Sequence, residues 1–356
     1  MEKLEQAAPV ADHAEGFDRI FETFKSTGAL KDSDKLYGIG HRVVHGGEAF
    51  HKPTLITNEV IETIREQVPL APLHNPANLL GIEAVFARRP DIPQVAIFDT
   101  AFHQTIPAYA FQYALPVDLA RTYQIRRYGF HGTSHLYVAK TAARYLGRPL
   151  EKLNLITCHL GNGASICAIR NGQSVDTSMG MTPLEGLIMG TRSGDIDPGI
   201  VFYLGRKTGK SLDELDALLN KESGMKGLCG INDMREIEDR ADAGEKQASL
   251  ALDMYCYRIK KYIGMYTAVL GRLDGLIFTA GVGENSDLVR ADACSELSVL
   301  GILLDPDKNR AKHDGVAEIQ SENSRVKILI VPTNEELEIA EQTVACLKNN
   351  GGCNGQ

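Results

Sequence analysis

Two glycine-rich turns, each following an apolar strand-like segment, are the parts of this chain best suited to binding an anion. Residues 153–157 lead into the turn at 159–165, and residues 276–280 lead into the turn at 281–285. Glycine has no Cβ, so backbone N–H groups can come close to a phosphate, and glycine also adopts the positive φ that a tight turn requires. Two such turns indicate a nucleotide whose phosphates are bound from more than one side, although either turn alone is equally typical of an ordinary strand-to-helix connection. Neither has the spacing of a P-loop or a Rossmann fingerprint.

Two arginines lie beside glycines and are candidates for binding a phosphoryl group. Arg42 stands near the end of a predicted strand that finishes in two glycines, and Arg192 lies in the glycine-containing segment 190–198. A guanidinium in such a place can approach a phosphoryl group closely and donate two parallel N–H bonds. Each arginine could instead form a surface ion pair, and Asp195 is a ready partner for Arg192.

Two carboxylates are candidates for a Mg²⁺ site. Asp99 ends a predicted buried strand, and Glu335 lies in the first turn of the last predicted helix. Magnesium in phosphate-binding sites takes one or two protein carboxylates, with phosphate and water as the other ligands. Glu335 also has a purely structural explanation, because a carboxylate in the first turn stabilises the helix dipole.

Eight of the ten histidines lie between residues 41 and 159, which raises the alternative of a zinc site. His41 and His45, like His131 and His135, are four residues apart, as in a helical zinc pair. The first pair lies in a strand-like segment and the second is interrupted by residues that favour a turn, so most of these histidines are expected to be neutral hydrogen-bonding groups. No Ser-His-Asp constellation, nucleophile elbow or reactive-cysteine motif is present.

The composition limits the class of protein. The chain has 356 residues, enough for two domains, and a formal net charge of -8, which argues against a nucleic-acid or anionic-membrane partner. Its seven cysteines are an odd number without a Cys-x-x-Cys pair, as is typical of reduced thiols in a cytoplasmic enzyme. No apolar run is long enough to span a membrane, and the acidic start is unlike a signal peptide.

Alternating strands and helices predict two α/β domains with a cleft between them. The charged stretch at 145–152 is the expected passage between the domains. The predicted elements are an amphipathic helix over 17–24, strands over 37–47 and 94–99, helices over 58–67, 211–220 and 248–270, strands near 276 and over 326–331, and a last helix opened by a capping box of Thr333 and Glu336.

Nine blocks, in order along the chain, resemble the acetate kinase (acetokinase) family. They are HRVVHGG at 41–47, APLHNP at 71–76, FDTAFH at 98–103, YGFHGTSH at 128–135, CHLGNG at 158–163, GTRSGDIDP at 190–198, NDMR at 232–235, GVGEN at 281–285 and PTNEE at 332–336. Propionate kinase shares nearly all of them. The resemblance implies reversible in-line phosphoryl transfer between ATP and acetate, giving acetyl phosphate and ADP, with propionate kinase or a catalytically inactive nucleotide-binding protein as the alternatives.

The resemblance also implies the fold and assembly. It is that of the actin, sugar-kinase and heat-shock-chaperone superfamily, an α/β fold of two actin-like (ribonuclease-H-like) domains with a nucleotide cleft between them, usually as a homodimer. The expected domains are 1–148 and 149–335, with a C-terminal helix over 336–348 packing back on the first domain and a disordered tail over 349–356.

The roles of individual residues follow from the resemblance alone. Arg42 and Arg192 would bind acetate or acetyl phosphate, and Arg192 would stabilise the transferring phosphoryl group together with His131. Asp99 would orient acetate or hold Mg²⁺ through water, while Glu335 would hold Mg²⁺, with Mn²⁺ as an alternative ion. The methyl pocket would be Val44, Leu73, Phe130 and Pro183, and the nucleotide would lie against His159, Asn162, Gly163, Asp233, Arg235, Gly281, Gly283 and Asn285.

One departure from the family pattern concerns the start of the chain. Acetate kinases resemble one another in opening with a hydrophobic strand and an Asn-x-Gly-Ser-Ser-Ser loop, and this sequence contains no such segment. The first domain is therefore expected to be amino-terminally incomplete, with one exposed edge on its sheet. A chain of this kind is expected to be prone to association and to have little or no kinase activity.

Overall fold

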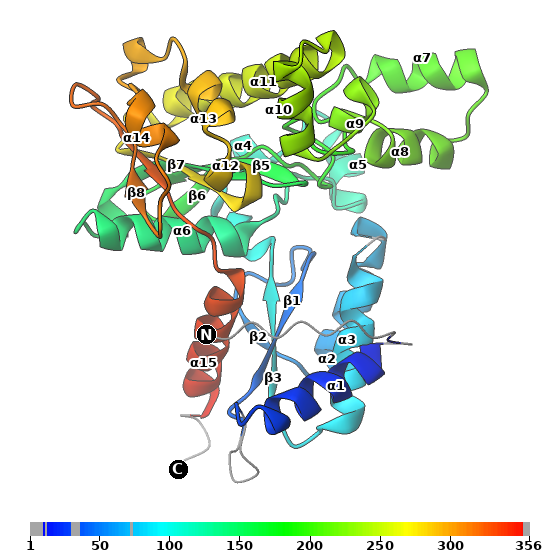
Figure 1. Cartoon of the computed structure of the whole chain (residues 1–356). Helices are drawn as coiled ribbons and strands as arrows, with labels where there is room; N and C mark the ends of the chain where they lie inside the picture. Colours follow the sequence, from blue (N-terminus) through cyan, green and yellow to red (C-terminus); the bar gives the residue numbers. More distant parts are fainter. Residues whose placement is uncertain (1–9, 11–12, 30–35, 72–73, 352–356) are drawn as a thin grey trace. The chain divides into compact units, whose positions relative to one another are not determined.

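The computed structural model describes residue 10 and residues 13–29, 36–71 and 74–351, which belong to two compact units (Figure 1). The first unit comprises Met1–Ala101 and Glu336–Gln356, and the second comprises Phe102–Glu335. Each unit has its own sheet and is described by itself.

The first unit contains a three-stranded sheet in the order β1-β3-β2. Strand β1 (Ile39–Val43) runs parallel to the central strand β3 (Gln94–Phe98), and β2 (Thr54–Leu55) pairs with β3 in the antiparallel sense. All five residues of β3 are buried, as expected for the apolar run that the sequence shows there. In the described part of the chain β1 pairs with β3 alone, so it forms an edge of this sheet.

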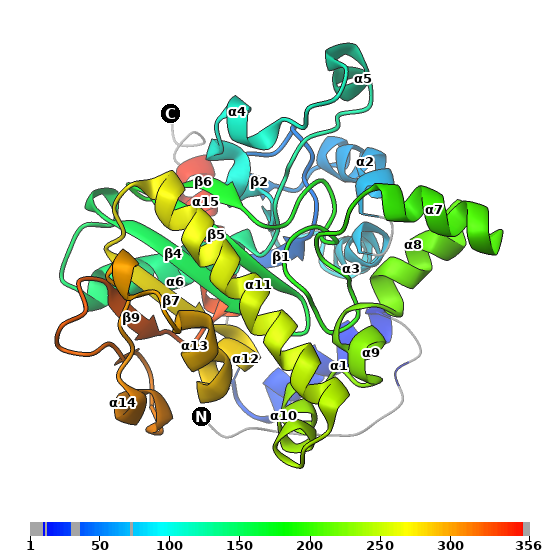
Figure 2. The ribbon, with the colours of Figure 1, turned by 90° about the horizontal axis from the view of Figure 1, so that it is seen from above.

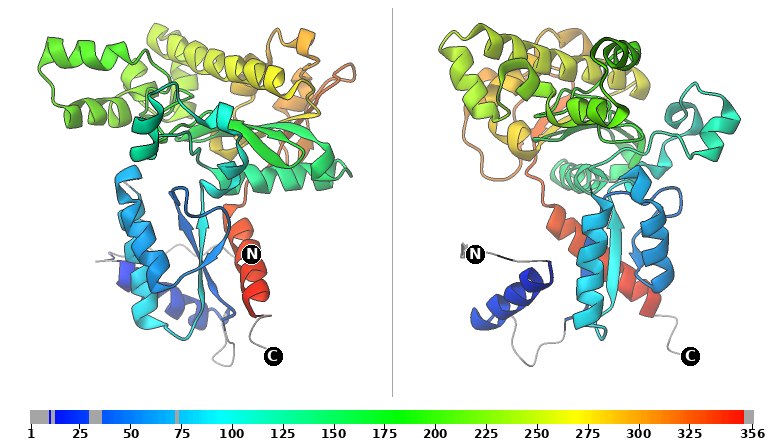
Figure 3. Two further views of the ribbon diagram at one scale, coloured as in Figure 1. Left: turned by 180° about the vertical axis from the view of Figure 1, so that it is seen from behind. Right: turned by 90° about the vertical axis from the view of Figure 1, so that its right-hand side faces the viewer.

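Helices cover both faces of the first sheet. On one face lie α2 (Asn58–Glu66) and α3 (Asn75–Arg88), with α1 (His13–Ser26) packed on α3 and a short 3₁₀ turn η1 (Val68–Leu70) after α2. Helix α15 (Glu335–Gly351) runs along the other face (Figures 1 and 3). This helix approaches β1 so closely that a Cβ at Gly40 would lie only 2.4 Å from Thr343 Oγ1.

The expected capping box of α15 is wrong. The helix begins at Glu335, two residues later than predicted, and the Thr333 hydroxyl lies 2.9 Å from the hydroxyl of Ser134. Thr333 is therefore used in a tertiary hydrogen bond, which local sequence cannot reveal.

The second unit contains a mixed six-stranded sheet in the order β6-β5-β4-β7-β9-β8. Strands β4, β7 and β9 are parallel, and the pairs β4–β5, β5–β6 and β8–β9 are antiparallel. The strands are β4 (Asn154–Leu160), β5 (Ala164–Arg170), β6 (Gln173–Thr177), β7 (Gly275–Thr279), β8 (Ala317–Glu318) and β9 (Lys327–Ile330). Every residue of β4 and β7 is buried, because helices cover both faces of the sheet.

Helix α6 (Gly132–Tyr145) packs on one face, and the long helix α11 (Lys246–Leu270) crosses the other face over β4 and β5 (Figures 1 and 2). The start of α6 overturns the expected turn at 131–135, since the helix begins at Gly132 and includes His135. Helices α12 (Ala280–Asn285) and α13 (Asp287–Cys294) follow β7, and α13 packs against α11.

The remaining helices of the second unit surround this core. They are η2 (Ala101–Thr105), α4 (Ala108–Phe111), α5 (Val117–Thr122), η3 (Leu150–Lys152), α7 (Gly199–Thr208), α8 (Leu212–Lys221), α9 (Gly224–Cys229), α10 (Met234–Asp242), η4 (Ser298–Leu300) and α14 (Pro306–Arg310). Helix α8 opens with a true capping box, in which Ser211 and Glu214 each accept a backbone N–H.

The compact units do not divide the chain at the expected position of 148/149. Residues 102–148 belong to the second unit because α6 packs on β4 and β7 of the second sheet. Among the described residues, no helix combines the length and the apolar character that a membrane crossing requires.

Candidate functional site

In the first unit, Arg42 and Asp99 form an ion pair. Arg42 is at the end of β1 and Asp99 directly follows the neighbouring strand β3, so parallel pairing brings the two side chains together. Arg42 Nε lies 3.1 Å from both carboxylate oxygens, and Nη2 lies 2.5 Å from Oδ2. Asp99 is buried, whereas 44% of the Arg42 side chain is exposed. The buried carboxylate can thus orient a guanidinium that still reaches solvent.

Val44, a predicted pocket residue, is buried beside this pair. Its N–H donates to Asn78 Oδ1, and the carbonyl of the preceding Val43 accepts the N–H of Asp99. Leu73, the other predicted pocket residue of this unit, lies outside the described residues.

In the second unit, Arg192 and His131 converge on the backbone of Gly163. A Cβ placed on Gly163 would lie 3.5 Å from Arg192 Nη1 and 3.6 Å from His131 Nε2. His131 has a φ of 58°, in the left-handed region, immediately before α6 begins. Such strained backbone in a non-glycine residue is typical of functional sites. The structure therefore brings together three residues that were predicted from separate motifs.

Arg192 is a half-buried cation. Its Nη1 donates to the carbonyl of Pro183, a predicted pocket residue, at 3.3 Å. The alternative ion pair with Asp195 is wrong, because Asp195 accepts hydrogen bonds from Gly186 N–H and the Tyr262 hydroxyl. Among the described residues no carboxylate lies within ion-pair distance of Arg192, and burial lowers the pKa of its guanidinium. A partly desolvated cation without a carboxylate nearby is well suited to an anionic ligand.

Hydroxyl groups hold the histidines in place. His131 Nδ1 and His135 Nε2 lie 2.9 Å and 2.8 Å from the Ser165 hydroxyl, and His159 Nδ1 lies 2.8 Å from the Ser134 hydroxyl. The imidazole of His159 also stacks on that of His131, with 4.3 Å between ring centroids. Burial lowers the pKa of His135 well below its ordinary value, so this histidine stays neutral.

The sequence alternative of zinc has no support in these contacts. The described residues contain no group of three or more His, Cys, Asp or Glu side chains placed to hold a metal ion. Phe130, the predicted pocket residue before His131, is buried, and its carbonyl lies 2.9 Å from His103 Nε2.

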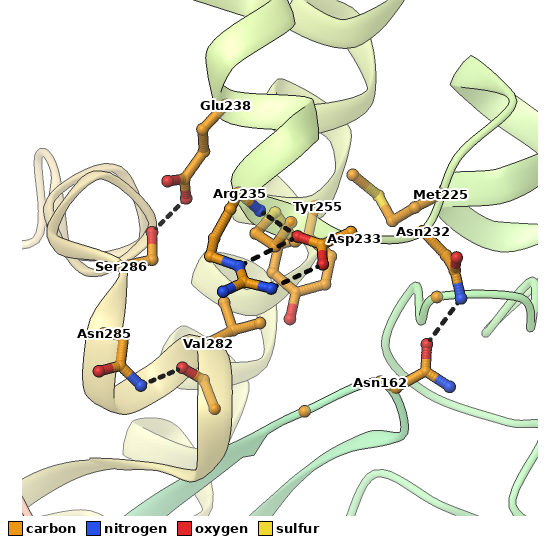
Figure 4. Close-up of a pocket in the computed structure, with 14 residues that line it drawn as sticks. Asn162, Met225, Asn232, Asp233, Arg235, Glu238, Tyr255, Val282, Asn285 and Ser286 are labelled. Atoms are coloured by element: carbon orange, nitrogen blue, oxygen red, sulfur yellow. Dashed lines mark hydrogen bonds and ion pairs between the residues drawn. The ribbon is translucent and has the colours of Figure 1, made fainter.

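A pocket of about 580 Å³ lies beside the two glycine-rich turns (Figure 4). Five residues predicted to bind the nucleotide line it: Asn162, Asp233, Arg235, Gly281 and Asn285. The lining also includes Gly161, Gly190, Met225, Asn232, Met234, Glu238, Tyr255, Val282 and Ser286. Its volume and its mixture of apolar and polar side chains suit a nucleoside-sized ligand.

The turn at 161–163 is tied to the segment that carries Arg192. The N–H of Gly190 donates to the carbonyl of Asn162, and a Cβ at Gly190 would lie 1.9 Å from Asn162 Oδ1. Only glycine allows this approach. The same Oδ1 accepts a hydrogen bond from Asn232, which comes from the start of α10 (Figure 4).

Asp233 caps α10 and pairs with Arg235. Its carboxylate accepts the N–H of Arg235 and of Glu236, and Arg235 Nη2 lies 3.0 Å away from Oδ2. Hydrogen bonding to Arg235 lowers the pKa of Asp233, so this carboxylate stays ionised. Both side chains are exposed at the pocket (Figure 4), where they can contact a ligand.

The second glycine-rich turn is helical, since residues 280–285 form α12. Gly281 faces the pocket, whereas Gly283 is buried against β4 and β7 and is absent from the lining. Glu284 holds the turn by accepting the N–H groups of Ala280 and Thr333. Thr333 lies two residues before Glu335, the predicted Mg²⁺ ligand, which is half-buried at the start of α15.

Sequence reasoning missed several residues of the pocket and of the histidine network. Met225, Glu238, Tyr255 and Ser286 line the pocket, and Ser134, Ser165 and Thr157 position the histidines. The Tyr255 hydroxyl is buried and has no hydrogen-bond partner among the described residues. Ser134 and Ser165 stood in the recognised motifs, but nothing local in the sequence distinguishes Tyr255 from other buried residues of α11.

Comparison with known proteins gives consistent similarities. A family model described as "Acetokinase family" matches residues 1–341. The acetate kinase of Syntrophobacter fumaroxidans is 55% identical over 357 aligned residues, which cover 99% of this chain and 86% of that protein. The acetate kinase of Porphyromonas gingivalis superposes with a TM-score of 0.91 at 45% identity, covering 96% of this chain and 86% of the other. A propionate kinase from Francisella tularensis superposes with a TM-score of 0.88, also at 45% identity, over 93% of this chain and 84% of the other.

Proposed function

The chain belongs to the acetokinase family and is a phosphotransferase with a carboxylate acceptor. We propose specific roles for its residues in the transfer of a phosphoryl group between ATP and acetate. In the proposed step an acetate oxygen forms a bond to the γ-phosphorus while the bond from phosphorus to the ADP oxygen breaks. Acetyl phosphate and ADP leave, and the reaction runs in both directions. Such in-line transfer needs positioned reactants and stabilisation of charge on the phosphoryl oxygens.

The observation that carries this proposal is the convergence of Arg192 Nη1 and His131 Nε2 on Gly163. Arg192 would donate N–H bonds to the phosphoryl oxygens as charge redistributes on them, and His131 would bind the same group. Ser165 supports this role for His131, because its hydroxyl bonds Nδ1 and fixes the ring.

Arg42 would bind the carboxylate of acetate. Its ion pair with buried Asp99 supports this role, since the pair restricts the guanidinium while leaving part of it exposed. Asp99 would then act through Arg42, because both of its oxygens already accept N–H groups from that arginine. Within the first unit, the buried side chain of Val44 would contact the methyl group of acetate.

The pocket of the second unit would bind the adenosine part of ATP or ADP. Asp233 and Arg235 on α10 and Gly281 and Asn285 on α12 would contact it. The first turn, with Asn162 and Gly163, would lie next to the phosphates, and His159 would support it through its stacking on His131.

We propose Glu335 as the protein carboxylate that holds Mg²⁺, with Mn²⁺ as an alternative. A half-buried carboxylate at the start of α15 is an oxygen donor of the kind that Mg²⁺ takes. Asp99 fits less well, because its two oxygens accept hydrogen bonds from Arg42. When bound, the ion would offset negative charge on the nucleotide phosphates.

The direct test is ATP formation from acetyl phosphate and ADP by the purified chain, followed with a coupled hexokinase assay. We expect turnover that requires Mg²⁺ and is abolished by EDTA. An otherwise folded protein that binds ADP without forming ATP would instead support the inactive nucleotide-binding alternative.

The acyl preference has two candidates, because both an acetate kinase and a propionate kinase are structurally similar to this chain. We propose acetate as the preferred acid. Initial rates with acetate and propionate, compared as kcat/KM, decide between them.

We also propose a cytoplasmic homodimer. An apolar stripe on the exposed side of α11 supports a second copy as partner, since Leu250, Met254, Tyr257 and Met265 are exposed at helical spacing. Sedimentation equilibrium would show a mass of two chains if the proposal is right and one chain if it is wrong.

A further inference from the structure

The segment that carries Arg192 is a closed loop, residues 186–195, whose two ends bond to each other. The N–H of Gly186 donates to Asp195 Oδ1 at 2.8 Å, and the N–H of Asp195 donates to the carbonyl of Gly186 at 3.0 Å. Gly194 has a φ of 64°, and a Cβ there would lie 2.2 Å from the carbonyl oxygen of Leu187. The loop is therefore closed by a carboxylate and packed too tightly for a side chain at Gly194.

Helix α11 holds the closed end of this loop through two side chains one turn apart. The Tyr262 hydroxyl donates to Asp195 Oδ2 at 2.8 Å. Arg258 Nη1 donates to the carbonyl of Gly186 at 2.7 Å, and its Nη2 donates to the carbonyl of Asp195 at 3.2 Å. Because α11 packs on β4 and β5, these bonds attach the loop to the central sheet of the unit.

The contacts of Arg192 itself explain why this attachment matters. Its guanidinium is held only by the Pro183 carbonyl and the sulfur of Met189 among the described residues. The backbone around it is held more firmly, since the Arg192 carbonyl accepts the N–H of Met189. The position of the guanidinium therefore depends on the position of the loop.

We propose that Asp195, Tyr262 and Arg258, here called the α11 clamp, are positioning residues that place Arg192 for phosphoryl transfer. The proposal rests on the role proposed above for Arg192. In the described part of the chain, the side-chain hydrogen bonds of the three residues join them to one another and to Gly186, so each acts through the loop. Burial raises the pKa of Tyr262, which keeps its hydroxyl a neutral donor to the Asp195 carboxylate.

The first test is Tyr262→Phe, which removes one oxygen and keeps the ring. We expect kcat to fall by roughly tenfold, because displacements of about 1 Å in positioning groups reduce rates by up to about a hundredfold. The KM for ADP should change less than kcat, since the pocket is built mainly on α10 and α12. Tyr109→Phe is the matched control, because Tyr109 lies on α4 and is 85% exposed.

A double-mutant cycle with Arg192→Ala tests whether the clamp acts through Arg192. We expect Tyr262→Phe to change the residual activity of Arg192→Ala by less than about twofold, because residues that act as a unit are not additive. If Tyr262→Phe lowers kcat by the same factor in the parent and in Arg192→Ala, the clamp is overturned and the proposed function is left intact. An Arg192→Ala protein with parental activity would overturn the role of Arg192 and the clamp with it.

Conservative rescue and hydrogen exchange supply readouts that general destabilisation would not give. Asp195→Asn keeps an oxygen for the Gly186 N–H and should retain far more activity than Asp195→Ala at matched folded fraction. In Tyr262→Phe, faster amide exchange should be confined to residues 186–195, measured without substrate. Unchanged exchange in this loop, or exchange raised equally throughout the second unit, would contradict the clamp.

Discussion

The surroundings of Arg192 differ from those of an ordinary surface arginine. Its guanidinium is partly desolvated, and Asp195, the partner that the sequence suggested, accepts hydrogen bonds from Gly186 and Tyr262 instead. We therefore predict that Arg192→Ala lowers kcat by roughly a thousandfold or more, as for other arginines that stabilise a transferring phosphoryl group. Arg192→Lys should recover little activity, because an ammonium cannot donate two parallel bonds.

Steady-state rates with acetyl phosphate and ADP check this prediction. Arg206→Ala is a suitable control, because Arg206 is an exposed arginine on α7. Turnover by Arg192→Ala near the parental rate would remove Arg192 from the proposed site.

Val44 gives a second prediction at the residue scale. It is buried at the end of β1, and we predict that Val44→Ala improves propionate relative to acetate by roughly tenfold, since one methylene is worth about 1 to 3 kcal/mol of discrimination. The ratio of kcat/KM for the two acids measures the effect. Val95→Ala, at a buried position of β3, should lose stability without changing that ratio, and a shift as large in Val95→Ala would contradict the pocket assignment.

At the scale of elements, the loop 186–195 depends on a glycine that no other residue can replace. A Cβ at Gly194 would lie 2.2 Å from a backbone oxygen, so we predict that Gly194→Ala displaces the loop and lowers kcat by more than about tenfold. Gly209→Ala is the matched control, because Gly209 also has a positive φ of 71° but has no atom within 4 Å of the added Cβ. It should cost only the left-handed strain of about 1 kcal/mol. Equal losses in the two variants would show that backbone strain, rather than crowding at the loop, causes the effect.

The packing of one element on another also determines which histidines lie close together. The start of α6 supplies His131 and His135, and the hairpin of β4 and β5 supplies His159 and Ser165. Because α6 packs on β4, hydroxyls of one element orient imidazoles of the other. These hydroxyl contacts account for the orientation of His131 and His159.

At the scale of the whole molecule, buried histidines make stability depend on pH. Burial lowers the pKa of His103 from 6.5 to about 4, and it also lowers that of His135. Below pH 6.5, the ordinary pKa of His103, the unfolded chain therefore binds more protons than the folded chain, so the free energy of unfolding decreases as the pH falls toward about 4. The His103 shift alone corresponds to about 3 kcal/mol.

We predict that the free energy of unfolding falls less between pH 7.5 and pH 5 in His103→Gln than in the parent. This holds even if the variant is less stable than the parent at each of the two pH values. Denaturant unfolding followed by circular dichroism measures the two differences. Burial raises the pKa values of Asp176 and Glu238, which work in the opposite direction, so the comparison between variant and parent isolates His103. Equal losses in the two proteins would contradict the assignment.

Much of the fold and of the candidate site is predictable from the sequence, because it depends on local patterns. The buried strands at 94–98 and 154–160 and the long helix α11 follow from apolar runs and helical periodicity. The ordered motifs identified the family, and the glycine-rich turns pointed to the ends of β4 and β7, where the pocket lies.

Only the tertiary structure decided which polar groups pair, because a side chain's partner depends on packing between distant segments. Local sequence made Asp195 the natural partner of Arg192, yet Tyr262, 67 positions along the chain, bonds that carboxylate. The sequence around Thr333 is typical of a helix cap, yet the Thr333 hydroxyl lies beside that of Ser134, 199 positions away. The same packing determines that Arg42 pairs with Asp99, because parallel strands 57 positions apart end side by side. The periodicity of the sequence thus determines the helices and strands, whereas the tertiary packing determines which partner each charged side chain has.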